Sequence, residues 1–172
     1  FLATTLGWDF WEVGGFLAVW IIGYGIVQSM APYFTGRRSG KVPDGRAAFI
    51  WAVLLTVVPA AMAVALAAGQ DAQTVLVAGL MLFGVLFAIN SSQHSYLIVS
   101  YATDDGVSLD VGFYYMANAL GRLLGTVLSG WVFQVAGIGA CLAISAVLVA
   151  SAAVVSLALP RHPRNEATPE IR

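Results

Sequence analysis

The stretch VGFYYMANALGRLLGTVLSGWVFQV, from Val111 to Val135, decides the fold of this chain. It is almost wholly apolar, and about 20 such residues in a helix are enough to cross the hydrocarbon core of a bilayer. Arg122 is its one charged residue, and insertion scales put a guanidinium at this depth at about +2.5 to +3.5 kcal/mol. Such a residue faces a bundle interior or a water-filled cavity by default. The stretch therefore predicts a transmembrane helix beside a solute pathway.

The composition of the whole chain is that of a membrane protein. Of its 172 residues, 59% are hydrophobic and 10% are charged, against about 45–50% and about 25% in soluble domains. Its mean hydropathy is +0.84. The net charge of −1 gives no reason to expect a nucleic-acid partner. The chain opens at Phe1 without a basic n-region, so we expect no signal peptide and interpret the sequence as a fragment.

Five apolar stretches are long enough to span a bilayer of lipid. They cover residues 11–34, 47–69, 74–101, 111–135 and 138–159. Short connectors with Gly and Asp separate them, the last of which is Ala136-Gly137. Prolines and mixed charges predict a disordered, cytoplasmic tail over residues 161–172. We therefore predict an all-α, polytopic transmembrane helix bundle over residues 1–160, with no second domain.

The basic residues predict the orientation of these spans. Five spans place the first loop and the C-terminus on one side, and the connectors opposite them carry acidic residues but no Lys or Arg. The positive-inside rule then puts the C-terminus in the cytoplasm and the protein in the cell (inner) membrane. The residues that decide this are Arg37, Arg38, Lys41 and Arg46 in the first loop and Arg161, Arg164 and Arg172 in the tail.

The span around Arg122 predicts a binding surface. Tyr114, Asn118 and Arg122 follow one another at a spacing of four, and Tyr115 adjoins them, so a phenol, an amide and a guanidinium lie along the helix. No carboxylate of this chain lies at the depth of Arg122, since Asp110 is about 18 Å away along the axis. We interpret Asp110 as a helix N-terminal charge, with a coupling role as the alternative. A permanently charged, forked guanidinium fits an anionic solute.

Small residues on the same span predict helix packing. Gly121, Gly125 and Ser129 are four residues apart. This small-xxx-small spacing lets a partner helix approach closely.

The third span carries a polar run at bilayer depth, which we expect to face protein or water rather than lipid. Asn90, Gln93 and His94 are candidate solute-binding residues within it. Because the third and fourth spans run in opposite directions, Asn90 should lie level with Asn118, and His94 with Tyr114 and Tyr115. His94 is either a hydrogen-bonded packing residue or a proton carrier. We expect no metal site, since the other histidine, His162, is in the tail.

The first span has a stripe of Trp20, Tyr24 and Gln28 at four-residue spacing. The stripe either lines the solute cavity, in which case Tyr24 and Gln28 bind solute, or packs against a neighbouring helix. The second and fifth spans are dominated by Ala, Val and Leu, which is typical of peripheral, lipid-facing helices.

Two bland helices among three polar ones, with the basic Gly36-Arg37-Arg38 loop after the first span, resemble the major facilitator superfamily of transporters. The resemblance covers helices eight to twelve of that fold. It implies alternating access against an N-terminal half that lies outside this sequence.

More narrowly, the chain resembles the organoarsenical efflux transporters of the ArsJ type, over nearly all of its length except the tail. The strings that carry the resemblance are GWDFWEVG (7–14), GYGIVQ (23–28), FAINS with HSY (87–91 and 94–96) and VGFYYMANALGRL (111–123). It implies export of 1-arseno-3-phosphoglycerate and a functional pairing with glyceraldehyde-3-phosphate dehydrogenase, which makes this solute when arsenate replaces phosphate.

Two alternatives to organoarsenical export stay open. A facilitator transporter of a drug, a sugar or an organic acid would keep the same fold. A membrane enzyme or a non-transporting subunit would differ in class, but no nucleophile, metal set or phosphate-binding loop supports an enzyme. We expect no catalytic residues and no cofactor.

Overall fold

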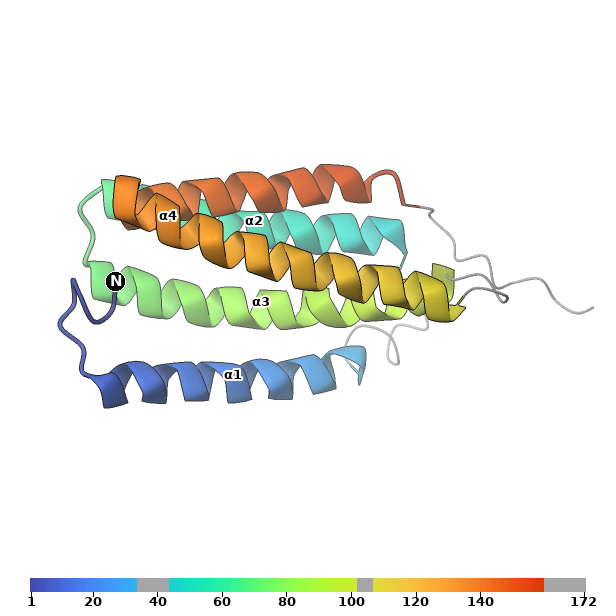
Figure 1. The fold of residues 1–172 in the computed structure, drawn as a ribbon, viewed down its shortest axis with the longest axis horizontal. Coiled ribbons are helices and arrows are strands. Elements are labelled where there is room, and N and C mark those ends of the chain that lie inside the picture. The colour runs from blue at the N-terminus through green and yellow to red at the C-terminus, as the bar shows by residue number, and fades with distance from the viewer. Residues whose placement is uncertain (34–43, 102–106, 160–172) are drawn as a thin grey trace, which may run out of the picture.

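The computed structural model describes residues 1–33, 44–101 and 107–159. Within these ranges the chain is helical, with elements α1 (Phe10–Pro32), α2 (Gly45–Ala67), α3 (Ala72–Tyr101) and α4 (Val107–Ser156) (Figure 1). Each element is long and apolar enough to cross a membrane. The predicted all-α helix bundle is therefore confirmed. Arg37, Arg38 and Lys41 of the predicted basic loop, and the predicted tail, lie outside the described residues.

Element α4 contains two helices that meet at Gly137. This residue has φ 76° and ψ −175°, a conformation that glycine adopts readily and other residues adopt only under strain. The chain reverses there, so that the two halves of α4 run back beside one another (Figure 1). We call residues 107–136 α4a and residues 138–156 α4b. With this division, the described helices correspond to the five predicted spans.

The acidic residues of the connectors cap the helices. Asp9 and Glu12 form a capping box, in which the Glu12 amide donates to Asp9 Oδ1 at 2.7 Å and the Asp9 amide donates to Glu12 Oε2 at 2.8 Å. Asp44 accepts from the first amides of α2. Asp71 accepts from the Thr74 amide at 2.8 Å. Hydrogen bonds from the Thr74 side chain and backbone lower the pKa of the Asp71 carboxyl below its ordinary value.

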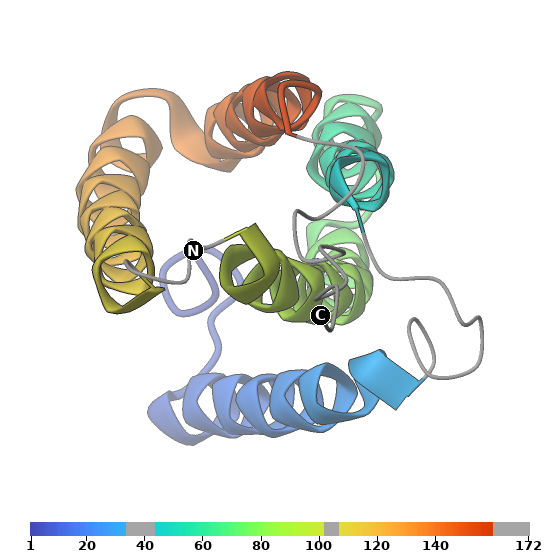
Figure 2. The same cartoon turned by 90° about the vertical axis from the view of Figure 1, so that its right-hand side faces the viewer.

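The helices pack in a fixed order around α3. Seen along the bundle, α1 lies on one side of α3 and α2 on another, while α4b lies against α2 and α4a stands apart (Figure 2). Val58, Met62 and Leu76 form a small core where α2 meets α3. The register of this pair depends on Gly79, because a Cβ there would collide with the Met62 thioether.

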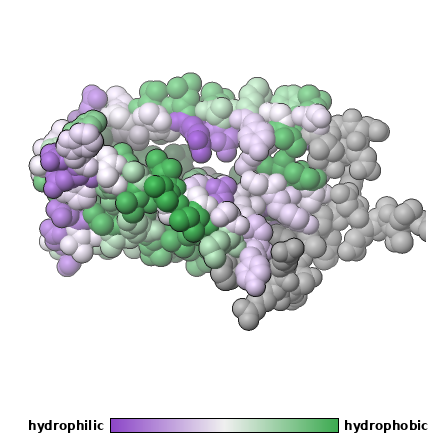
Figure 3. Space-filling view, turned by 90° about the horizontal axis from the view of Figure 1, so that it is seen from below, coloured by the Kyte–Doolittle hydropathy of each residue, from purple (hydrophilic) through white to green (hydrophobic). Residues whose placement is uncertain are grey.

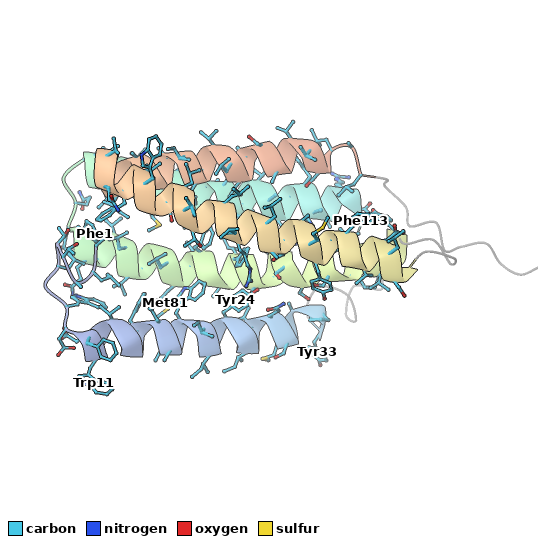
Figure 4. All side chains as sticks on the ribbon, viewed as in Figure 1. Phe1, Trp11, Tyr24, Tyr33, Met81 and Phe113 are labelled. Atoms are coloured by element: carbon cyan, nitrogen blue, oxygen red, sulfur yellow. The ribbon has the colours of Figure 1, made fainter. Side chains whose placement is uncertain are left out.

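Large apolar side chains cover the outside of the bundle. Phe10 and Trp11 are each 80% exposed, and Trp11 points away from the other helices (Figure 4). Lipid accepts such a surface, since a helix satisfies its own backbone hydrogen bonds. Several polar side chains are instead buried between the helices, among them Asn90 and Gln93.

Candidate functional site

The stripe of Trp20, Tyr24 and Gln28 packs against α3. Trp20 Nε1 donates to the carbonyl oxygen of Leu80 at 2.8 Å, and a Cβ at Gly84 would lie 2.8 Å from the same nitrogen. The Tyr24 ring lies between those of Trp20 and Phe87, at centroid distances of 5.8 and 5.6 Å, and points toward α3 (Figure 4). Of the two alternatives for this stripe, the structure shows helix packing.

Gln28 belongs to the same interface. Its Nε2 donates to the Ser91 hydroxyl at 3.4 Å, which ties the last turns of α1 to the polar run of α3. Tyr24 and Gln28, two of the predicted solute-binding residues, are therefore placed to hold α1 on α3.

The polar run of α3 lies inside the bundle. Asn90 is 9% exposed and Gln93 is 4% exposed, and Asn90 Oδ1 and Gln93 Oε1 have no hydrogen-bond partner. Gln93 is fourteen residues, about four turns, after Gly79, so it shares the face that packs on α2. His94 is half-buried. A buried carbonyl oxygen without a hydrogen bond lowers the stability of the folded protein by about 1–3 kcal/mol. Both amides of α3 therefore carry an acceptor whose burial is not compensated among the described residues.

A cavity of about 1080 Å³ opens between α2, α3, α4a and α4b. We call it the α3–α4 cavity. Most of its wall is apolar, and its polar wall residues are Asn90, His94, Tyr101, Asp110, Tyr114 and Ser156. Asn90 and His94 therefore share one space with Tyr114, whereas Asn118 and Tyr115, which the opposite directions of the two spans also placed at their levels, do not line it. The spacing of Asp110, four residues before Tyr114, was the sequence signal for its place on this wall.

Tyr115, Asn118 and Arg122 lie on a neighbouring face of α4a, which we call the Arg122 flank. All three are exposed, and none lines the α3–α4 cavity. At 3.6 residues per turn, Arg122 is rotated by about 80° from Tyr114 around the helix axis. The adjacent rings of Tyr114 and Tyr115, 5.4 Å apart, mark the edge between the cavity wall and the flank.

The Arg122 flank faces the side on which the N-terminus lies. Phe133 is eleven residues, about three turns, after Arg122 and therefore shares its face. The ring of Phe133 meets that of Phe1 edge to face at 6.2 Å, and the N-terminus lies between α4a and α3 in the view along the bundle (Figure 2). Hydrophilic residues also border a hollow on the molecular face seen in Figure 3. The flank thus turns toward the inside of the helix arrangement.

The Arg122 guanidinium has no ion-pair or hydrogen-bond partner among the described residues, and only its carbonyl oxygen accepts, from Thr126 Oγ1 at 2.8 Å. Arg122 lies midway along α4a, about 22 Å from either end at 1.5 Å per residue. The arrangement offers a permanent positive charge midway along α4a that has no partner among the described residues, with an amide and a phenol on the same flank.

The predicted packing stripe of α4a has no helix against most of it. A Cβ added to Gly121 or Gly125 would meet nothing within 4 Å in the described part of the chain. Only Ser129 has a neighbour, since its carbonyl oxygen accepts from Cys141 Sγ at 3.5 Å. The glycines have no helix against them because α4a makes few contacts with α3, whereas α4b packs along α2 (Figure 2).

Metal-binding side chains do not gather anywhere in the described ranges: no three His, Cys, Asp or Glu residues there form a candidate metal site.

Comparison with known proteins gives one match. A family model described as Major Facilitator Superfamily matches residues 1–172. No curated protein and no solved structure matches the chain. The match covers every helix that contributes to the cavity and to the Arg122 flank.

Proposed function

The chain belongs to the Major Facilitator Superfamily of membrane transporters, and on this premise we propose that it exports an organic anion whose charge is bound by Arg122. The observation that carries the proposal is the unpaired guanidinium midway along α4a. A charge at this depth is costly unless it meets an anion or water. Export of an anion gives it such a partner during each transport cycle.

The chemistry of the flank suits a phosphate-like oxyanion. A guanidinium presents several N–H donors in a planar fork that matches two oxygens of a phosphate or arsenate group. Asn118 is one turn before Arg122 and adds an amide, while Tyr115 adds a hydroxyl. The low dielectric of the membrane interior strengthens each of these contacts.

The remaining candidates act from other positions in this proposal. Asn90, His94 and Tyr114 wall the α3–α4 cavity, Gln93 lies on the face toward α2, and Tyr24 and Gln28 join α1 to α3. We assign direct contact with the anionic groups to the flank alone. Tyr114 lies at the edge between the flank and the cavity.

For the substrate we propose an organoarsenical, 1-arseno-3-phosphoglycerate. The support is the resemblance to the ArsJ-type transporters, whose strings include the whole stretch from Val111 to Leu123. The solute carries both a phosphate and an arsenate group, so it matches a site built on a guanidinium. Its formation by glyceraldehyde-3-phosphate dehydrogenase would give the protein a role in arsenate resistance.

The proposed cycle is alternating access in the cell membrane, with the C-terminus in the cytoplasm. In such transporters two halves rock about a site near the bilayer midplane, and we assign Arg122 to that level because it lies midway along α4a. The partner of the helices described above would be the N-terminal half of the same transporter.

The test uses the full-length protein in arsenate-sensitive cells that also express the dehydrogenase. Wild type, Arg122→Lys and Arg122→Ala are compared at equal membrane abundance for arsenate tolerance and for export of the organoarsenical. Arg46→Lys is the matched control, since Arg46 is the other arginine in the described ranges and is exposed at the start of α2. We expect export to fall at least about tenfold in both Arg122 variants, because lysine cannot bind bidentately. Equal export by all four proteins would refute the role of Arg122.

A further inference from the structure

His94 has no hydrogen-bond or ion-pair partner among the described residues. The buried side-chain nitrogen and oxygen atoms without a partner in these ranges belong to Asn90 and Gln93. The ring nitrogens of His94 are not among them, and the residue is half-buried, so these nitrogens are accessible to water. Of the two roles that the sequence predicts for His94, a hydrogen-bonded packing residue is therefore not what the structure shows.

The α3–α4 cavity gives this imidazole a route to water. His94 lines the cavity, which at about 1080 Å³ has room for many water molecules. His94 is seven residues, about 10 Å, before Tyr101 at the end of α3. This is the end of α3 that the basic residues of the sequence assign to the cytoplasm. A proton bound by His94 therefore has a short path through the cavity to that side.

His94 is the group of this wall whose charge changes near neutral pH. An imidazole ordinarily titrates at about pH 6.5 and a phenol at about pH 10. The other titratable side chains in the wall are Tyr101 of α3 and Asp110 and Tyr114 of α4a, and Asp110 already has an interaction of its own. From α2 and α4b the wall receives apolar side chains and Ser156, and α1 meets α3 at Phe87 through Tyr24. Among the described residues, no lysine or arginine lines the cavity to oppose a positive charge on His94.

The apolar part of the wall makes protonation reversible. Water in the cavity solvates an imidazolium ion, whereas the surrounding Leu97, Ile98 and Leu148 side chains do not. Loss of water favours the neutral ring, because a charge without a partner is unstable in apolar surroundings. A cavity that fills with water and empties again therefore loads and unloads a proton at His94.

We propose that His94 carries a proton in exchange for the exported anion and releases it through the α3–α4 cavity to the cytoplasmic side. The imidazole takes up a proton from water while the transporter is open to the outside, which forms an imidazolium ion. It returns this proton to water in the cavity when the transporter is open to the cytoplasm. An outgoing anion and an incoming proton both move with a membrane potential that is negative inside. The inference rests on the proposed transport cycle, but the proton site itself depends neither on Arg122 nor on the identity of the anion.

Isotope-edited NMR of the histidine-labelled, full-length protein in lipid nanodiscs tests the proton site without any anion. The ring resonances that are missing from His94→Gln identify His94. We expect these resonances to titrate between about pH 5 and 8 in the wild type. Ser95→Ala is the matched control, because Ser95 lies on the same helix but off the cavity wall, where its hydroxyl donates to the Ser91 carbonyl oxygen, and it should titrate as the wild type does. A His94 ring that keeps one protonation state over this range would overturn the proposal.

A cavity-filling variant tests the route of the proton. Ala117 lines the cavity three residues after Tyr114, so Ala117→Trp should displace water from this space without altering a polar side chain. We expect the titration of His94 to be lost from this pH range in Ala117→Trp, because the charged ring is no longer solvated. An unchanged titration in this variant would overturn the cavity as the route.

Export at two external pH values tests the carriage of the proton. The full-length proteins are compared in arsenate-sensitive cells that express the dehydrogenase, and efflux is divided by the amount of organoarsenical inside the cells. External acid increases the inward driving force on a proton, so efflux by the wild type and by Ser95→Ala should be at least about threefold faster at about pH 6 than at about pH 8. His94→Gln should show equal efflux at both values.

The outcomes separate this inference from the anion proposal. Export by the wild type without acceleration in acid, or the same acceleration in His94→Gln, would overturn His94 as the carrier and leave the anion proposal standing. No export by the wild type at either pH would refute the anion proposal and the exchange with it, whereas the titration would still decide whether His94 binds a proton.

Discussion

The ring of Phe1 meets the ring of Phe133 edge to face, with their centroids 6.2 Å apart. Phe133 lies three turns beyond Arg122 on the same face of α4a, so this contact fixes the side of the helix on which the guanidinium is found. That side faces the N-terminal turn rather than the outer surface of the bundle. The ring contact lies some 16 Å from Arg122 along the axis of α4a at 1.5 Å per residue.

The closeness of α1 to α3 depends on the absence of a side chain at Gly84. A Cβ there would lie 2.8 Å from Trp20 Nε1, and the indole cannot retreat without losing its hydrogen bond to Leu80. We expect Gly84→Ala to destabilise the protein by about 1–3 kcal/mol, measured as a lower midpoint of thermal unfolding of the full-length transporter. Gly25→Ala is the control, since a Cβ at Gly25 meets nothing within 4 Å. An unchanged midpoint in Gly84→Ala would contradict the close packing.

The reversal between α4a and α4b depends on Gly137. Its positive φ and extended ψ belong to a region that is open essentially to glycine alone. We expect Gly137→Ala to cost about 1–3 kcal/mol of stability, whereas Gly139→Ala, two residues later in regular helix, should not. The two stabilities are compared by measuring the unfolding of both variants and of the wild type in the same detergent. If both variants unfold like the wild type, the backbone at Gly137 is not the constraint described here.

The cap of α3 predicts a dependence of stability on pH. Hydrogen bonds from Thr74 lower the pKa of the Asp71 carboxyl in the folded protein. A carboxyl whose pKa is lowered by folding stabilises the protein above its unfolded pKa, and this contribution is lost as the pH falls through the folded pKa. Asp71→Asn keeps a cap but has no titrating group. We expect the stability difference between wild type and Asp71→Asn to favour the wild type at neutral pH and to shrink in acid. A difference that does not change with pH would rule out this contribution.

Much of the fold follows from hydropathy alone, because a span needs only length and a lack of charge. The first predicted span, 11–34, compares with Phe10–Pro32 in the structure, and the third, 74–101, with Ala72–Tyr101. The largest boundary difference is at the start of α4, which begins at Val107 rather than at 111. Polar residues such as Ser108 and Asp110 extend the helix by a first turn that the apolar pattern does not mark.

The sequence predicted less about which helix each polar face meets. Residues spaced by four drift by about 40° per step around a helix of 3.6 residues per turn, so Tyr114 reaches the cavity wall while Arg122 does not. The stripe of Trp20, Tyr24 and Gln28 was compatible with a cavity or with packing, and the glycine that receives Trp20 lies more than sixty residues away on another helix. The spacing of residues gives the direction in which each side chain leaves its own helix. Which other helix lies in that direction depends on tertiary contacts that the spacing does not contain.

The central claim is that the Arg122 flank faces water rather than lipid, and thiol labelling at one depth tests it most directly. In a full-length Cys141→Ala background, Asn118→Cys places a thiol on the flank, and Leu120→Cys places one about 160° from Arg122 around α4a, near the opposite side. Leu120 is 54% exposed, so its lack of reaction would not be due to burial in protein. We predict that a membrane-impermeant anionic thiol reagent labels Asn118→Cys and leaves Leu120→Cys unmodified. Labelling of Leu120→Cys with protection of Asn118→Cys would place the guanidinium among lipids and contradict the account.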